Sequence, residues 1–285
     1  MKFKIIYLAV IFCLCFSCRK VDSQPKDFEI DAYKLSNTKI KMENHTGEVN
    51  KSTMFYGEKI TLFYEDISGF KKKDSLVYPD MHIFVTGQKG DTVLIQKNLL
   101  DNKKGFIEEE LNLRSNLTFA EPMKSGNSYI MHVNIIDKNS DAYYNVKKDF
   151  SIIENPMLNT KTDGLTYEIL YLFSQTRNIS IIDNKISPNE SVYILLEGLE
   201  GYKVDADGKV DLEASISLTE ANGRVINQND NLFEKPVSAR DLKDQLYASI
   251  SLTEGEVKNP VTCVFKIKDK NSGHTFETSL DLIVE

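Results

Sequence analysis

The sequence predicts an all-β protein made of two tandem β-sandwich domains behind a short secretion signal. Apolar and polar residues alternate in many short segments, which is the period of a half-buried β-strand. The sequence also repeats itself, because the quartet Asp-Lys-Asn-Ser stands at 137–140 and again at 269–272. At 285 residues and 41% hydrophobic content, the chain holds enough material for two ordinary domains.

The first residues are typical of a signal peptide. Lys2 and Lys4 form a charged start, an apolar run covers 5–16, and the small Ser17 precedes the expected cleavage point. The apolar run is shorter than the roughly 20 residues of a membrane-spanning helix. We therefore expect residues 1–17 to be removed.

Cys18 follows this point, in the stretch Leu-Cys-Phe-Ser-Cys at 14–18. The stretch resembles the looser lipoboxes, ending in Ser-Cys, of Bacteroidota lipoproteins, although Leu14 stands one place further from the cysteine than in the commonest form. The resemblance implies acylation of Cys18, palmitate included, and a lipid-anchored location at the outer membrane, facing the periplasm or the cell surface. Two or more acyl chains anchor a protein durably, since each buried CH₂ contributes about 0.8 kcal/mol. Residues 18–29 then form a polar tether; an ordinary cysteine-rich signal peptide is the alternative.

Charge and cysteine content exclude two classes of protein. The formal net charge is −7, and loss of Lys2 and Lys4 makes the mature chain more acidic. This argues against nucleic acid as a partner, because phosphate contacts need cations. Of the four cysteines, only Cys18 and Cys263 remain after cleavage. With Cys18 acylated, no disulfide framework is possible within one chain.

The repeat extends beyond the quartet. Residues 57–70 and 189–202 share apolar positions and three identical residues at equal spacing, namely Glu58, Glu65 and Gly69 in the first copy and Glu190, Glu197 and Gly201 in the second. Two copies are too few for a solenoid, which needs three or more stacked units. An internal duplication of one domain is therefore predicted.

In both copies the quartet connects two alternating runs. Residues 129–135 and 261–267 precede it, and residues 144–152 and 276–284 follow it. Asp and Asn favour turns, so the quartet is expected to form the hairpin between the last two strands of each copy. Helical periodicity is weak, and only a turn or two is expected near Glu108 and Arg240.

A polar connection punctuated by Pro156 and Gly164 separates the copies. We expect the first domain at residues 30–154, a linker at 155–164 and the second domain at 165–285.

These segments resemble the Ig-like sandwich modules common in surface and periplasmic lipoproteins of Bacteroidota. The resemblance rests on strand order, on Gly-Phe at 69–70 and Gly-Tyr at 201–202, and on the Asp-Lys-Asn-Ser turn. It implies tandem Ig-like or fibronectin-III-like β-sandwiches and nothing about a ligand, because a fold does not fix a function. The Cys-Trp-Cys signature of antibody-type domains is missing, since the chain has no Trp.

Familiar catalytic motifs are absent from the sequence, which contains no G-x-S-x-G, Walker-type G-x-x-x-x-G-K, G-x-G-x-x-G or H-E-x-x-H. No histidine stands in a pattern that pairs it with a nucleophile; the four are His45, His82, His132 and His274. Cys263 lies at an apolar position of an alternating run and is expected in the core. The chain is therefore expected to be no enzyme and to hold no cofactor.

Two kinds of modification or metal site are candidates. Asp205, Asp207 and Asp211 place oxygen ligands on a tight turn, as calcium loops do, but a solvated turn is favoured because other acids of an EF-hand loop are missing. Ser75 and Thr92 each stand between an aspartate and an apolar residue. That pattern resembles the O-glycosylation acceptor of Bacteroidota.

Phe84 and Ile136 stand at outward-facing positions of alternating runs, where the second copy has Ser217 and Lys268. They are expected to expose an apolar contact patch on the first domain. Single exposed apolar side chains are also ordinary, which is the alternative interpretation.

Together these patterns predict a lipid-anchored envelope protein that acts as a non-catalytic binding or assembly module. Its expected partner is a protein of an outer-membrane or secretion complex. The alternative is a glycan-binding surface lipoprotein, since sandwiches bind sugars through exposed aromatic platforms. The 13 Tyr and 15 Phe leave this open, and the absence of Trp weakens it.

Overall fold

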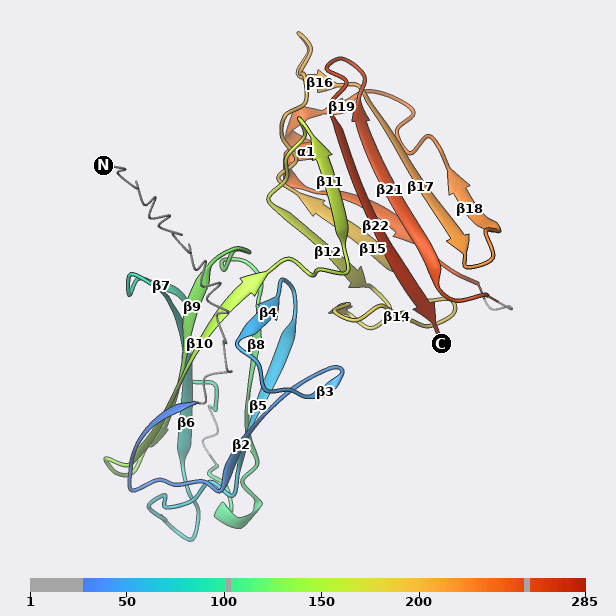
Figure 1. Cartoon of the computed structure of the whole chain (residues 1–285). Coiled ribbons are helices and arrows are strands. Elements are labelled where there is room, and N and C mark those ends of the chain that lie inside the picture. Colours follow the sequence, from blue (N-terminus) through green and yellow to red (C-terminus); the bar gives the residue numbers. More distant parts are fainter. Residues whose placement is uncertain (1–27, 101–103, 254–256) are drawn as a thin grey trace, which may run out of the picture.

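A computed structural model describes residues 28–100, 104–253 and 257–285 of the chain. These residues form two β-sandwich domains, drawn in blue to green and in yellow to red in Figure 1. Among them, helical structure is confined to a 3₁₀ turn, η1 (Glu108–Glu110), and a short helix, α1 (Ala239–Asp244), both where the sequence predicts a turn or two. Neither has the length and apolar character that crossing a membrane requires.

The first domain packs two sheets face to face. One sheet has the order β1-β10-β9-β6-β7, with the short β4 added to β10 in parallel. The other has the order β3-β2-β5-β8. The strand bounds are β1 (Glu29–Tyr33), β2 (Lys39–Asn44), β3 (Gly47–Glu48), β4 (Thr53–Phe55), β5 (Lys59–Glu65), β6 (Pro79–Gly87), β7 (Thr92–Gln96), β8 (Leu113–Thr118), β9 (Ser128–Asp137) and β10 (Tyr143–Ile153).

The second domain repeats this topology strand for strand. Its sheets have the orders β11-β22-β21-β17-β18, with β14 added to β22 in parallel, and β13-β12-β15-β20; β16 pairs with β19 separately. The bounds are β11 (Asn159–Asp163), β12 (Ile169–Ser174), β13 (Ile179–Ser180), β14 (Lys185–Ile186), β15 (Val192–Glu197), β16 (Lys209–Val210), β17 (Leu212–Glu220), β18 (Val225–Asn229), β19 (Val237–Ser238), β20 (Leu246–Ile250), β21 (Val261–Asp269) and β22 (Thr275–Val284). The predicted fold class, two tandem sandwiches of Ig-like or fibronectin-III-like type, is confirmed.

Alternation along the strands builds the two cores. In β9 and β21 every second residue is buried, and these residues face the opposite sheet of the same domain. Large buried side chains include Tyr64 and Phe119 in the first domain and Phe265 and Phe276 in the second. Each fully buried apolar side chain contributes about 1.5–3 kcal/mol, so the two cores stabilise the described residues, whose one cysteine, Cys263, is free.

Two of the repeated residues are buried carboxylates that hold the start of a strand. Glu58 accepts hydrogen bonds from the Lys51 ammonium (2.8 Å) and from the Phe55 backbone N–H (3.0 Å). Glu190 accepts from the Arg177 guanidinium (2.6 Å) and from the backbone N–H of Ser187 (2.8 Å). A buried charge requires such pairing, which explains why both copies keep the glutamate together with a cation.

The repeated Gly69 and Gly201 permit a close approach of two backbone segments. Both have positive φ, and a Cβ at Gly69 would lie 2.2 Å from the carbonyl oxygen of Lys34. A Cβ at Gly201 would lie 2.1 Å from the carbonyl oxygen of Gly164. Only glycine fits at such a contact.

The Asp-Lys-Asn-Ser quartet forms the turn between β9 and β10 and between β21 and β22, as predicted. Its aspartate also reaches a distant loop. Asp269 is fully buried and accepts hydrogen bonds from the Ser272 hydroxyl (2.5 Å) and from the backbone N–H of Lys203 (2.8 Å). Asp137 accepts the same two bonds in the first copy, at the same distances, from Ser140 and Lys71. The quartet is a structural clamp in both domains.

One predicted boundary is wrong. Residues 155–164, expected to form a linker, contain β11, which pairs with β22 along its whole length, and Leu158, which lies in the second core. The pattern hides this strand because β11 lies at an edge of its sheet. Four of its five residues are exposed, so no alternation marks it. The second domain therefore includes most of the expected linker.

Candidate binding surfaces

Cys18, the predicted acylation site, lies outside the described residues. Cys263 is buried on β21, where burial raises the pKa of its thiol to about 12. At neutral pH this thiol is protonated and shielded, so it is no nucleophile.

The carboxylates of two of the three candidate calcium ligands, Asp205 and Asp211, are engaged with other groups. The Asp205 carboxylate accepts hydrogen bonds from the backbone N–H groups of Asp207 (2.9 Å) and Lys209 (2.8 Å), which closes the turn. Asp211 pairs with the ammonium of Lys270 at 2.8 Å. Across the described residues, no group of three or more His, Cys, Asp or Glu side chains is arranged to hold a metal ion. The geometry describes an aspartate-closed turn beside an ion pair.

The two candidate O-glycosylation residues lie on the surface of the first domain. Ser75 is exposed in the loop before β6, with positive φ, and Thr92 is exposed at the first position of β7. Both hydroxyls are accessible to a modifying enzyme, so the glycosylation hypothesis stays a prediction.

Phe84 and Ile136 face outward, but they do not form one patch. They lie on the paired strands β6 and β9, where the pair His82–Asn134 separates them. Each is half-buried. The Phe84 ring stacks on the imidazole of His132, with centroids 4.3 Å apart. The expectation of a joint apolar patch is corrected, since polar side chains divide the two residues.

The two domains contact one another through aromatic rings and a close backbone approach. Tyr56 of the first domain packs against Tyr171 of the second, with ring centroids 5.4 Å apart. The buried Ile169 of β12 joins the first domain's core. A Cβ at Gly57 would lie 2.1 Å from the Ser180 hydroxyl, so glycine permits this contact. Burial of these groups fixes one end of β12 against the first domain.

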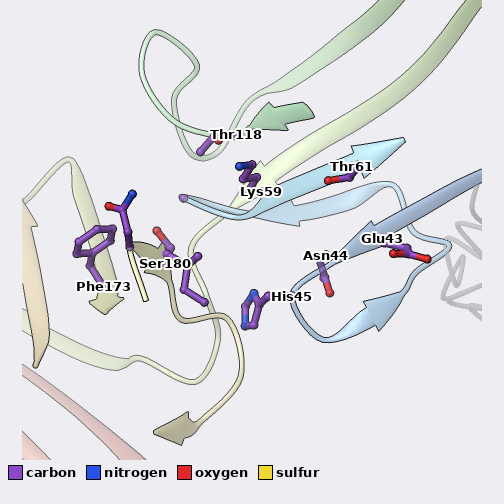
Figure 2. A pocket seen from close by; sticks show the side chains of 11 residues that line it. Glu43, Asn44, His45, Lys59, Thr61, Thr118, Phe173 and Ser180 are labelled. Atoms are coloured by element: carbon purple, nitrogen blue, oxygen red, sulfur yellow. The ribbon is translucent and has the colours of Figure 1, made fainter. Parts of the chain in front are cut away.

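Beside this contact lies an interdomain groove of about 350 Å³ (Figure 2). The first domain contributes side chains of β2, β5 and β8, including Glu43, Lys59 and Thr61. The second contributes the Phe173 ring and the turn around Asn178. Across the groove, the His45 imidazole lies 3.7 Å from the Asp183 carboxylate. The groove is polar on one wall and aromatic on the other.

Phe173 also belongs to a larger apolar surface, which we call the aromatic face. It is the outer side of the sheet β13-β12-β15-β20. The strand register places its members in two adjacent rows: Tyr171, Leu195 and Tyr247 in one, and Phe173 and Tyr193 in the other. Tyr247 is 65% exposed. The rings of Tyr193 and Tyr247 meet edge to face with centroids 5.6 Å apart.

Four of the five corresponding positions of the first domain carry polar or charged side chains, and the fifth carries a phenylalanine. By register, Lys41 corresponds to Tyr171, Glu43 to Phe173, Thr61 to Tyr193, Phe63 to Leu195 and Arg114 to Tyr247. There Lys41 pairs with Glu65, and Thr61 donates to Asn116 at 2.7 Å. Because the two sheets share one topology, the aromatic side chains are not needed to form it.

Neutral and charged polar groups border the aromatic face. At one end the Glu197 carboxylate accepts hydrogen bonds from the Tyr171 hydroxyl (3.2 Å) and the Gln245 amide (3.0 Å). Burial, followed by this carboxylate, raises the pKa of Tyr171, which stays protonated at neutral pH. At the other end the Tyr193 hydroxyl donates to Gln175 at 2.9 Å. An apolar centre with a polar rim is the usual anatomy of a protein interface.

The sequence interpretation missed the aromatic face. The signal was the run Val-Tyr-Ile-Leu-Leu at 192–196, in which apolar residues fill both parities of a strand with one buried side. Such a run indicates either a strand buried on both sides or an exposed apolar face. Recognising the face also requires the register of β15 with β12 and β20, which cannot be derived from the sequence alone.

Comparisons with known proteins show similarity only to solved structures, since no family model and no curated protein matches the chain. One is called pT26-6p (9% identity, TM-score 0.27), covering 90% of this chain and 66% of that one. The fibronectin(III)-like modules of CbhA from Clostridium thermocellum match at 9% identity and TM-score 0.20, over 86% of this chain and 94% of that one. Trypsin-activated α2-macroglobulin from Escherichia coli matches at 12% identity and TM-score 0.27, over 85% of this chain but 15% of its own length. At these values the similarities carry no functional argument, and the fold class rests on the strand pairing.

Proposed function

We propose that this chain is a lipid-anchored, non-catalytic binding module of the cell envelope, which captures a partner protein on the aromatic face of its second domain. Acylation of Cys18 and an outer-membrane location are parts of the same proposal and rest on the lipobox resemblance. The observation that carries the binding role is the divergence of two duplicated sheets, which are polar at four of five positions in the first domain and apolar at all five in the second.

The composition of the face favours a protein partner. Tyrosine rings supply large contact area at low entropic cost, and they are enriched among the residues that dominate binding energy. Leu195 lies between Tyr171 and Tyr247 in the central row and gives it an aliphatic centre. None of the five members of the face carries a formal charge at neutral pH.

The interdomain contact supports a binding role because it makes the face part of a larger concave surface. Tyr171 belongs both to the face and to the contact with Tyr56. Phe173 belongs both to the face and to the groove. A partner that covers Tyr193 and Tyr247 therefore has a continuous path into the groove and onto the first domain.

The test is site-specific photo-crosslinking in cells that express the full-length protein. A photoreactive amino acid replaces Tyr247, and the matched control carries it at Arg114, the corresponding position of the first domain. We expect one predominant crosslinked envelope protein with the probe at position 247, and its loss when Leu195→Asp is added. Equal crosslinking from both positions, or a product at position 247 that Leu195→Asp leaves unchanged, would refute the proposal.

A further inference from the structure

The outer side of the first domain's larger sheet carries a row of hydrogen-bonding side chains that the proposed function does not use. Strand register aligns His82 of β6, Asn134 of β9, Asn145 of β10 and Asp31 of β1. We call this set the amide row. Its members lie side by side across four strands, so the row spans three strand spacings, or about 14 Å. Figure 1 shows β6, β9 and β10 running next to one another in this sheet.

Rings and an aliphatic side chain flank the row on both sides. On one side Phe84 stacks on His132, and on the other Ile136 aligns with Tyr143 and Tyr33. The centroids of Tyr33 and Tyr143 lie 6.1 Å apart. The surface over Phe84, His132, Asn134 and Asn145 is hollowed, with a volume of about 410 Å³. The Lys147–Glu29 ion pair continues the line of Phe84 and His132 across the sheet. The row and this line form a shallow trough that is aromatic at one end and charged at the other.

Asp31 receives two long hydrogen bonds in the trough. The Asn145 amide donates to Asp31 at 3.5 Å, and the Tyr143 hydroxyl donates to the same carboxylate at 3.4 Å, both longer than the usual 2.9 Å of a good hydrogen bond. The only ammonium that lines the hollow, that of Lys147, pairs with Glu29 at 3.0 Å. Burial, and then Lys147, lower the pKa of His132, so its imidazole is neutral at neutral pH. His82 is engaged, since its Nδ1 accepts a hydrogen bond from the Asn98 backbone N–H at 3.1 Å. The two asparagine amides are therefore the main neutral donors and acceptors of the trough, beside two carboxylates and one ammonium.

The corresponding row of the second domain also lies under a hollow of about 410 Å³, but its side chains differ. The corresponding residues are Ser215, Lys266, Glu277 and Lys161. Glu277 pairs with Lys266 at 2.9 Å and lies 3.9 Å from the Lys161 ammonium, so these charges satisfy one another. The flanking positions are Ser217 and Val264 on one side and Lys268 and Thr275 on the other. Neutral amides with flanking rings are therefore a property of the first domain only.

We propose that the amide row binds a neutral oligosaccharide, laid across the strands beside the Phe84–His132 stack. An amide both donates and accepts hydrogen bonds, which matches sugar hydroxyls that do the same. Aromatic rings supply the apolar surface on which the C–H faces of a sugar pack, while the polar tip of Tyr143 stays wet. The chain is acidic, and the row itself includes Asp31, so uronic acids and phosphates are disfavoured. This site lies in a different domain from the aromatic face and does not depend on the proposed function.

The test is a titration of the full mature chain, made soluble by Cys18→Ala, with neutral hexasaccharides of glucose, mannose, galactose and xylose and with an acidic galacturonate oligomer. Two-dimensional NMR follows the side-chain amides of Asn134 and Asn145. We expect at least one neutral oligosaccharide to shift both amides at millimolar concentration or below. The galacturonate oligomer is expected to leave them in place.

Variants locate the site. Asn134→Ala and Phe84→Ala each remove one contact and are expected to weaken binding by about tenfold. The matched controls Lys266→Ala and Ser217→Ala change the corresponding residues of the second domain and are expected to bind like the parent chain. Both trough residues are half-buried surface residues, so unchanged melting of the variants shows that loss of binding is local. The proposal is overturned if no neutral oligosaccharide shifts the amides, if only the acidic oligomer does, or if the two trough variants bind as tightly as the controls.

Discussion

Replacement of Asp269 is expected to destabilise the second domain far more than a change in an ordinary hairpin turn. The carboxylate is buried and accepts three hydrogen bonds, from the Ser272 hydroxyl (2.5 Å) and from the backbone N–H groups of Lys203 (2.8 Å) and Asn271 (3.1 Å). A hydrogen bond to a charged group contributes about 1.5–3 kcal/mol, and a buried donor left without a partner costs about 1–3 kcal/mol. Because water replaces part of what is lost, we expect Asp269→Ala to lower the free energy of unfolding by about 3–4 kcal/mol. Asp269→Asn keeps the shape and is expected to cost about 1–2 kcal/mol.

The effect of Asp269→Asn must depend on pH. Burial alone raises the pKa of Asp269, but the hydrogen bonds from Ser272 and from the Lys203 and Asn271 backbone outweigh it and lower the pKa below the ordinary value. A carboxyl with a lowered folded-state pKa stabilises the fold above its unfolded pKa of about 3.9 and loses that contribution as the pH falls through the folded pKa. The difference between parent and variant is therefore full at pH 7 and shrinks below about pH 4.

Hydrogen exchange of the β21 and β22 amides in the full chain measures this locally, without assuming that both domains unfold together. The matched control is Asp281→Asn, an exposed carboxylate of β22 that accepts one bond from Thr262 (2.6 Å) and is expected to change stability by less than about 0.5 kcal/mol. An effect of Asp269→Ala no larger than that of the control, or an Asp269→Asn effect that is no smaller at pH 3 than at pH 7, would contradict the reasoning.

Three further predictions concern other parts of the chain. Gly57→Val places a side chain against the Ser180 hydroxyl and is expected to open the interdomain contact, which solution scattering would detect as a larger radius of gyration. The control Gly90→Val introduces a similar backbone strain, since Gly90 has φ +84°, but meets nothing within 4 Å. It is expected to leave the radius of gyration unchanged. Cys18→Ala is expected to move the protein from the detergent-extracted membrane fraction to the soluble fraction, and an unchanged distribution would exclude a lipid anchor at this residue. In the Cys18→Ala background, Cys263 is expected to resist thiol reagents at neutral pH and to react at once in urea, because burial raises its pKa to about 12; rapid labelling of the folded chain would contradict its burial.

The strands and their turns follow from the sequence because alternation and turn chemistry are local. The runs at 129–135 and 261–267 lie within β9 and β21, and the quartet after each closes a hairpin. The duplication adds confidence to each strand, since the same pattern occurs twice. The contribution of the quartet to stability could not be predicted, because Asp269 accepts a hydrogen bond from the backbone N–H of Lys203, which is distant in the chain.

Features that depend on pairing between strands escaped prediction. The sequence places Phe84 and Ile136 on the outer side correctly, but only the register of β6 with β9 shows the polar pair between them. The aromatic face needs three strands in register, and the amide row needs four. β11 escaped for a different reason, since an exposed edge strand has no buried side to mark it.

The longest strand of the first domain has an edge that two short strands share. β1 runs antiparallel along Tyr143–Lys147 of β10, and β4 runs parallel along Ser151–Ile153 of the same strand. β11 and β14 divide the edge of β22 in the same way. Open sheet edges invite strands of neighbouring molecules to pair and aggregate. One antiparallel and one parallel strand cover each of these long edges, so no single strand of another molecule can pair along the edge of β10 or β22. Neighbouring copies of the chain are therefore protected from edge-to-edge association through these two strands.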